Sequence, residues 1–303
     1  MHTRSCSRIN GLPHHGVTLT MNEPVANASK RTDGLPHFIP HQPFGRATRD
    51  IREGFLSWRV WTELALFDND QRYRRTVLGP LWITVNMAAF VVGMALVYSA
   101  IFKTDFATYL PYLTAGMIVW QFMVGLAGDA PTIFVQANQI INSMVMPLSV
   151  HVLRVILRHL IVLAHNLVVF TALVVLMDVP VTWHTSLVIP GLLLLVVTSV
   201  WVTLILATAG ARYRDLQPII TNVLQLMFFL TPLIWHRDVL SGGKLLWVDY
   251  NPLYHLIEIV RAPLLGQAPT LSSYVLVVAL NVVGIVAGFL FFRRFRHRIV
   301  YWL

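Results

Sequence analysis

Hydrophobic residues make up 56% of the 303-residue chain, charged residues only 12%, and the mean hydropathy is +0.63. An ordinary soluble domain carries roughly 25% charged residues, so the composition excludes a soluble globular protein and indicates a membrane protein with several spans. Many arginines behind the formal net charge of +9 lie beside apolar runs, which favours the anionic cytoplasmic leaflet over nucleic acid as their partner. The single cysteine, Cys6, excludes a disulfide framework and a cysteine metal cluster within one chain.

Residues 1–45 are polar, rich in Pro, His, Ser and Asn, and show no helical apolar period. We predict that they form a disordered cytoplasmic tail. No apolar segment of the length that a signal peptide needs follows the first basic residues. Met1 and Met21 are both candidate start residues.

Residues 49–67 have apolar side chains three and four positions apart, among them Trp58 and Trp61, with charged side chains between them. This pattern predicts an amphipathic helix that lies along the membrane surface. The helix either docks a partner below the bilayer or only anchors the chain, and the stretch itself favours neither interpretation.

Three arginines, Arg72, Arg74 and Arg75, mark the point at which the chain enters the bilayer. A nearly uncharged apolar run follows them, which places the cationic groups at the level of the lipid phosphates. Pro80 suits the first turn of a helix, and Trp82 suits the membrane interface. A membrane helix is therefore expected to begin here.

Six apolar segments are each close to the roughly 20 residues that a helix needs to cross the hydrocarbon. The groups of basic residues fall on one side of the membrane if both termini are cytoplasmic. The predicted fold is an all-α membrane protein with six transmembrane helices, preceded by the interface helix. The longest external connection, 237–273, is expected to hold short re-entrant or interfacial helices. The predicted spans lie near 80–102, 109–127, 150–177, 187–209, 217–236 and 274–292.

The sequence has no motif for catalysis or for a metal. It lacks an H-E-x-x-H helix, a phosphate-binding loop and a G-x-S-x-G elbow, so we predict no catalytic and no metal residues. His159, His165 and Asn166 fall in a predicted span, where either a proton relay or hydrogen bonding between helices would explain them. Hydrogen bonding is favoured, because no membrane-buried carboxylate is evident beside them in the sequence.

Amide and aromatic side chains share helical faces of two predicted spans. Asn86, Phe90 and Gly93 lie on one face of the first span, with Tyr98 next to it. Asn222, Gln225 and Phe229 lie on one face of the fifth span. An amide in hydrocarbon needs a partner or water, so each face should point to protein or to a lumen. Rings beside amides suit sugars, although packing in a dimer explains the pattern more simply.

Four blocks of sequence stand out, namely 72–82 (RYRRTVLGPLW), 211–216 (ARYRDL), 231–235 (TPLIW) and 251–253 (NPL), with Arg261 beyond. Taken together, they resemble the permease subunit of type-2 ATP-binding-cassette exporters of lipid-linked polysaccharides, which include O-antigen, teichoic acid and galactan exporters. The similarity runs from about residue 50 to the C-terminus. One departure is the acidic stretch 67–70, where such permeases often carry a basic residue.

The resemblance implies that 46–303 is the transmembrane domain of an exporter for a polyprenyl-diphosphate-linked galactan or O-antigen-like chain. Two copies would form a channel in the bacterial inner membrane above two separate ATPase subunits, which would bind ATP and Mg²⁺; this chain would need no cofactor and would not be an enzyme. The arginines at 72, 74 and 75 would then bind the diphosphate head group, although the charge bias of cytoplasmic loops explains them equally well. The channel lining would be Trp82, Asn86, Phe90, Gly93, Tyr98, Asn222, Gln225 and Phe229.

The resemblance also implies a coupling helix and an external gate. The segment 138–147 would seat in a cleft of the ATPase, and the alternative is an ordinary cytoplasmic turn. The residues expected at the ATPase are Trp58, Trp61, Asn138, Ile140, Ile141, Met144 and Met146. Those expected at the external gate are Asn251, Pro252, Tyr254 and Arg261.

Other classes fit the sequence less well. A type-2 exporter of teichoic acid or of a small molecule or lipid shares the six-span plan, but the small-molecule exporter would lack the aromatic and amide faces. A membrane glycosyltransferase would need an acidic catalytic pair in a loop. An ion-driven transporter would need a buried ion-binding carboxylate, and neither feature is evident.

Overall fold

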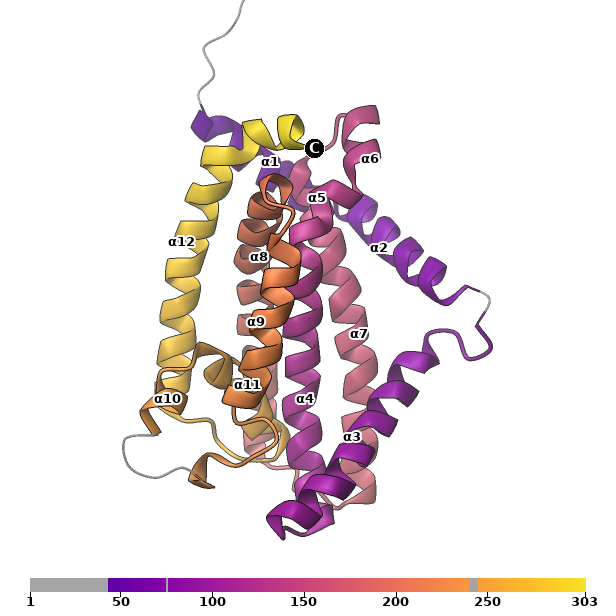
Figure 1. Ribbon diagram of the computed structural model, residues 1–303, viewed down its shortest axis with the longest axis vertical. Coiled ribbons are helices and arrows are strands. Elements are labelled where there is room, and N and C mark those ends of the chain that lie inside the picture. Colours follow the sequence, from indigo (N-terminus) through magenta and orange to yellow (C-terminus); the bar gives the residue numbers. More distant parts are fainter. Residues whose placement is uncertain (1–42, 75, 240–244) are drawn as a thin grey trace, which may run out of the picture. The chain divides into compact units, whose positions relative to one another are not determined.

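The computed structural model describes residues 43–74, 76–239 and 245–303, and this part of the chain is built from helices without strands (Figure 1). The all-α class is therefore confirmed. The predicted tail up to residue 42, as well as Arg75, lies outside the described residues, whereas residues 43–45 already belong to the first helix. The helices are α1 (Pro43–Leu56), α2 (Trp58–Tyr73), α3 (Leu81–Phe102), α4 (Phe106–Asp129), α5 (Ile133–Gln136), α6 (Asn138–Ser143), α7 (Leu148–Leu176), α8 (Val188–Arg212), α9 (Leu216–Leu230), α10 (Leu245–Asp249), α11 (Pro252–Leu264) and α12 (Leu271–Trp302), with 3₁₀ turns η1 (Ala130–Thr132), η2 (Trp183–Leu187) and η3 (Arg237–Val239).

Five helical segments of the described chain are long and apolar enough to cross a membrane. They contain α3, α4, α7, α8 and α12, and each overlaps a predicted span. The fifth predicted span corresponds to α9, which has only 15 residues. Such a helix is about 22 Å long at 1.5 Å per residue, against about 30 Å of hydrocarbon. A sixth crossing thus stays a prediction.

Helix α4 lies at the centre of the bundle and packs against α3, α7, α9 and α11. It is apolar around its whole circumference, and Leu113, Ile118 and Phe122 are all fully buried. A helix that is hydrophobic on every side is one that the rest of the fold surrounds. Because lipid is as apolar as these side chains, close packing rather than removal from water holds such helices together.

Helices α8 and α12 approach each other closely through two glycines. A Cβ atom added at Gly284 would lie 2.3 Å from the indole of Trp201, and one at Gly288 would lie 3.2 Å from its Cβ. Asn281 accepts hydrogen bonds of 3.0 Å from both Trp201 and Thr198. The G-x-x-x-G spacing therefore provides the space for a large ring, as in other membrane helix pairs with small residues.

The predicted interface helix 49–67 is divided in the structure into α1 and α2, with a break at Ser57. The Ser57 hydroxyl and backbone N–H both donate to the carbonyl of Glu53, at 2.7 and 2.9 Å. A side chain that bonds the backbone in this way competes with regular helix geometry. Only α1 is strongly amphipathic, and the prediction of one continuous helix was wrong.

Candidate functional site

The amide and aromatic face of α3 points away from the core of its own chain. Asn86 and Gly93 are exposed, and Phe90 keeps 46% of its surface accessible. The opposite side of α3 packs on α4 and α7. Within the described residues the Asn86 side chain has no hydrogen-bond partner. The buried side is formed by Ile83, Met87, Val91, Ala95 and Ser99.

Helix α9 presents a similar face. Asn222, Gln225 and Phe229 are all exposed, and Leu224 is the only buried residue of this helix. The two amides lack hydrogen-bond partners in the part of the chain that the structure describes. Both faces therefore require a partner outside the chain, which a second copy, water or a polar cargo would supply.

The other predicted lining and mouth residues differ in their exposure. Trp82 is 38% exposed, and Tyr98 is half-buried and stacks on Phe102 at 6.0 Å between ring centroids. Arg72 and Arg74 are exposed where α2 ends. Neither forms an ion pair with another described residue, so both guanidinium groups can reach an anion.

The predicted coupling segment 138–147 is the short helix α6 followed by an extended stretch that leads into α7. Asn138 donates from its amide to the backbone oxygen of Leu303 at 3.3 Å, so a hydrogen bond connects α6 with Leu303, just beyond α12. Ile140 and Ile141 turn partly inward, whereas Met144 is 60% exposed and Val145 is fully exposed. Val145 lies within the predicted segment, although it was not among the residues expected at the ATPase.

The other residues expected at the ATPase differ in exposure. Trp58 is 56% exposed at the start of α2. Trp61 is half-buried, and its indole N–H has no partner among the described residues. Met146 is half-buried and directly follows the exposed tip of the segment, which consists of Met144 and Val145. Trp58 and the tip of the coupling segment thus offer the more accessible apolar side chains.

A buried carboxylate joins α1 to the start of α7 and the end of α12. Asp50 is 2% exposed and accepts hydrogen bonds from the backbone N–H groups of Leu148 and Ser149 at 3.1 and 3.0 Å. The Ser149 hydroxyl adds a bond of 2.9 Å. Arg296 donates from Nε and Nη2 at 2.8 and 2.5 Å. Asp50 thus caps α7 directly after the predicted coupling segment.

A second network of charges lies about one and a half to three turns further along α7. Arg154 makes a bidentate ion pair with Asp68 of α2. Arg158 and His159 both bind Oδ2 of Asp129, at 2.6 and 3.0 Å. A carboxylate therefore does accompany His159, which the sequence had not indicated, and the interaction is a hydrogen bond between helices.

A polar cavity of about 130 Å³ lies between this network and α6, which contributes Ile140 to its lining. His151 lines it and is 1% exposed, yet neither ring nitrogen has a partner among the described residues. Asp68 and Arg154 line the same cavity. It is roomy enough for several waters, which would satisfy the imidazole.

The predicted external gate residue Arg261 is the centre of a buried cluster. It is 3% exposed and donates to the Tyr112 hydroxyl at 2.9 Å, to the Pro232 carbonyl at 2.8 Å and to Glu258 at 2.7 Å. Its guanidinium also lies 4.4 Å from the centre of the Tyr112 ring. Arg261 therefore joins α11 to α4 and to the chain after α9. Tyr112 and Glu258 were not among the residues expected at the gate, and the structure places both against Arg261.

The remaining residues predicted at the gate lie at the start of α11. Asn251 accepts from the backbone N–H of Leu253 at 3.0 Å, and Pro252 occupies the first helical turn, so this dipeptide begins the helix. Asn251 also donates to Thr231 at 3.0 Å. Tyr254 is buried, and this burial raises its pKa to about 12, so the phenol is neutral at physiological pH.

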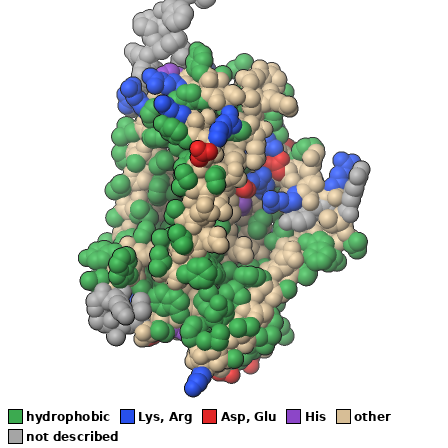
Figure 2. Space-filling view, viewed as in Figure 1, with side chains coloured by type: hydrophobic (Ala, Val, Ile, Leu, Met, Phe, Trp, Pro, Cys, Tyr) green, Lys and Arg blue, Asp and Glu red, His purple; other side chains and the backbone are tan. Residues whose placement is uncertain are grey.

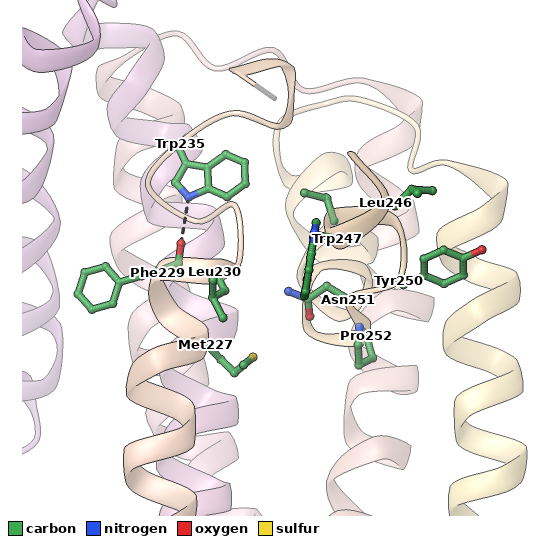
Figure 3. Close-up of a pocket in the computed structure, with 10 residues that line it drawn as sticks. Met227, Phe229, Leu230, Trp235, Leu246, Trp247, Tyr250, Asn251 and Pro252 are labelled. Carbon is green, nitrogen blue, oxygen red and sulfur yellow. Dashed lines mark hydrogen bonds between the residues drawn. The ribbon is translucent and has the colours of Figure 1, made fainter. Parts of the chain in front are cut away.

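An aromatic cleft of about 980 Å³ opens between the end of α9 and the segment that leads into α11 (Figure 3). In Figure 3, Phe229 and Trp235 lie on one side, and Trp247 and Tyr250 lie across from them. The Trp235 indole donates to the Phe229 carbonyl at 3.3 Å, whereas Trp247 is 80% exposed. The predicted lining residue Phe229 thus connects the amide face of α9 with this cleft.

Comparisons with known proteins agree with the resemblance inferred from the four sequence blocks. A family model described as ABC-2 type transporter matches residues 62–265. The chain is 28% identical, over 191 residues, to an O-antigen export system permease protein RfbA of Klebsiella pneumoniae, a match that covers 61% of this chain and 72% of the relative. A permease of the same name from Myxococcus xanthus is 22% identical over 216 residues, covering 71% and 83% of the two chains.

Proposed function

Since the chain belongs to the ABC-2 type transporter family, we propose that it is the membrane subunit of an ATP-driven exporter of a polyprenyl-diphosphate-linked polysaccharide. Relatives named as O-antigen export permeases support this class of cargo. Two copies would form the path across the bacterial inner membrane, with both termini in the cytoplasm. A separate ATPase subunit would bind ATP and Mg²⁺ and perform the hydrolysis.

The observation that carries the proposal is the exposure of the amide and aromatic faces of α3 and α9. Sugars present C–H faces that stack on rings and hydroxyls that bond to amides, so Phe90 beside Asn86 suits a glycan. Gln225 and Asn222 offer the same chemistry on α9. The exposed Arg72 and Arg74 would hold the diphosphate by charge-assisted hydrogen bonds at the cytoplasmic mouth.

ATP binding would act on the permease through the exposed tip at Met144 and Val145 and through Trp58 of α2. The Asp50 cap connects the following helix α7 with α1 and α12, so a push on the tip would move these helices together. On the outer side, the Arg261 cluster would hold α11 over the exit. The cargo and ATP favour different states of the path, and this difference in affinity couples them.

The test is ATP-dependent transport of lipid-linked glycan by the permease and its ATPase reconstituted in vesicles. We expect Phe90→Ala to slow transport about two- to tenfold, which corresponds to the loss of about 0.5–1.5 kcal/mol of ring contact. Val92→Ala is the matched control, because Val92 is 38% exposed on another side of α3. Failure of the wild-type pair to move any lipid-linked glycan would refute the proposed function.

A further inference from the structure

An open apolar groove of about 420 Å³ lies between α1 and α12 and belongs neither to the amide faces nor to the outer cleft. Phe289 contributes the wall from α12, about one helical turn before the arginine-rich end of that helix. The groove therefore lies where hydrocarbon gives way to phosphates in the cytoplasmic leaflet. Its lining consists of Thr48, Ile51, Arg52, Phe55, Leu56 and Phe289.

The groove side of α1 is distinct from the side that packs on the protein. Asp50 and Gly54 are buried against α7. Phe55 and Leu56, by contrast, are 67% and 65% exposed. An amphipathic helix that leaves large apolar side chains uncovered at the membrane interface places them among acyl chains.

The charged residue that lines the groove is an arginine. Arg52 lines it, is exposed and forms no ion pair with another described residue, and no carboxylate is among the lining residues. Further along α12, beyond Phe289 and outside the groove lining, Arg294 and Arg298 are exposed and have no ion pair with another described residue. Figure 2 shows Lys and Arg side chains gathered at this end of the molecule. A ligand that fits must combine an apolar chain with an anionic group.

We propose that this groove binds one anionic phospholipid of the cytoplasmic leaflet. The acyl chain lies against Ile51, Phe55 and Phe289, and the lipid phosphate lies beside Arg52. A zwitterionic lipid fits less well, because its own cation meets a cationic rim. The lipid fills the space between α1 and α12 next to the Asp50 cap. This inference does not depend on the nature of the exported cargo.

The experiment uses the full chain, assembled with its ATPase, in phosphatidylcholine nanodiscs that contain a trace of phosphatidylglycerol with a photoreactive acyl chain. Illumination followed by peptide mass spectrometry locates the label. We expect labelling within residues 48–56 and at Phe289, and competition by unlabelled phosphatidylglycerol but not by phosphatidylcholine. Arg52→Gln should lower the labelling about fivefold, the factor expected for one basic residue near an anionic surface.

Two further variants separate this site from general charge attraction. Arg59→Gln removes an exposed cation of α2 outside the groove and should leave the labelling unchanged. Phe55→Asp places a carboxylate in the groove and should abolish it. Equal labelling by a photoreactive phosphatidylcholine, or equal losses in Arg52→Gln and Arg59→Gln, would overturn the proposal. Labelling of the isolated chain that disappears in the assembled complex would show that protein covers the groove, and would also overturn it.

Discussion

Arg296 donates two hydrogen bonds to Oδ2 of Asp50, a residue 246 positions away in the chain, and the Asp50 side chain is completely buried. The same carboxylate caps the backbone at Leu148 and Ser149. One side chain therefore connects the surface helix α1, the end of α12 and the helix that follows the coupling segment. We therefore expect Asp50 to transmit movement between the proposed ATPase-binding segment and the helices α1, α7 and α12.

Replacing Asp50 with Asn keeps the size of the side chain. It removes the negative charge to which Arg296 and the backbone N–H groups at the start of α7 donate. We expect Asp50→Asn to lower the free energy of unfolding by about 2–3 kcal/mol, because a half-buried arginine loses its counter-charge. Unfolding of the purified chain in mixed micelles measures this. Glu53→Gln, which breaks the exposed pair with Arg49, is the control and should cost about 0.5 kcal/mol or less. Equal losses would contradict the role of Asp50.

The close approach of α1 and α7 gives a second prediction. A Cβ atom at Gly54 would lie 2.0 Å from the Ser149 hydroxyl oxygen, so Gly54→Ala must either displace this hydroxyl from Asp50 or move the two helices apart. We expect a loss of about 1–3 kcal/mol in the same unfolding measurement. At Gly45, on the same helix, an added Cβ meets nothing within 4 Å. Gly45→Ala should therefore be neutral or slightly stabilising, and a loss as large as that of Gly54→Ala would argue against the steric explanation.

The buried cluster around Arg261 predicts losses of stability of different size for two variants. Tyr112→Phe keeps the ring under the guanidinium and removes two hydrogen bonds, the one that the hydroxyl accepts from Arg261 and the one that it donates to the Trp235 carbonyl, so we expect a loss of about 1–2 kcal/mol. Arg261→Gln removes the charge from a buried site and leaves Glu258 without its partner, so the loss should reach about 3 kcal/mol. Thermal unfolding with a tryptophan fluorescence readout compares the two variants. The reverse order would show that the hydroxyl rather than the guanidinium holds the cluster together.

His236 supplies a pH-dependent prediction. It stacks on Tyr112 at 3.8 Å between ring centroids, and its pKa is lowered below the ordinary 6.5 by burial and by Arg261, against the opposing effect of Asp238. The unfolded chain therefore takes up a proton more readily than the folded chain. Stability should fall as the pH drops below about 6.5.

Melting temperatures at pH 7.5 and 5.5 test this effect of His236. His236→Phe keeps a ring against Tyr112 and cannot titrate, so its melting temperature should fall less than that of the wild type between these two values. An identical fall in both proteins would assign the pH dependence to other groups.

Much of the fold follows from local pattern. Hydropathy and basic residues located the five helices of crossing length. The helical spacing of Asn86 and Phe90 placed both on one face of α3, and the structure leaves this face exposed in the single chain. Local pattern could not reveal the bond between Asp50 and Arg296, because nothing near either residue specifies a partner so far along the chain. It also placed Ile140 and Ile141 at an outer surface, since apolar residues in a short polar segment look the same whether they face inward or outward.

The most direct test of the central claim asks what touches the exposed faces of α3 and α9 during transport. A photoreactive amino acid at Phe90 or Gln225, in the permease assembled with its ATPase and supplied with lipid-linked glycan and ATP, would capture its neighbour. We predict crosslinks to the glycan from both positions and none from Val92. Crosslinks only to the second copy of the chain, with or without ATP, would show that these faces pack in a dimer and would contradict the transport path.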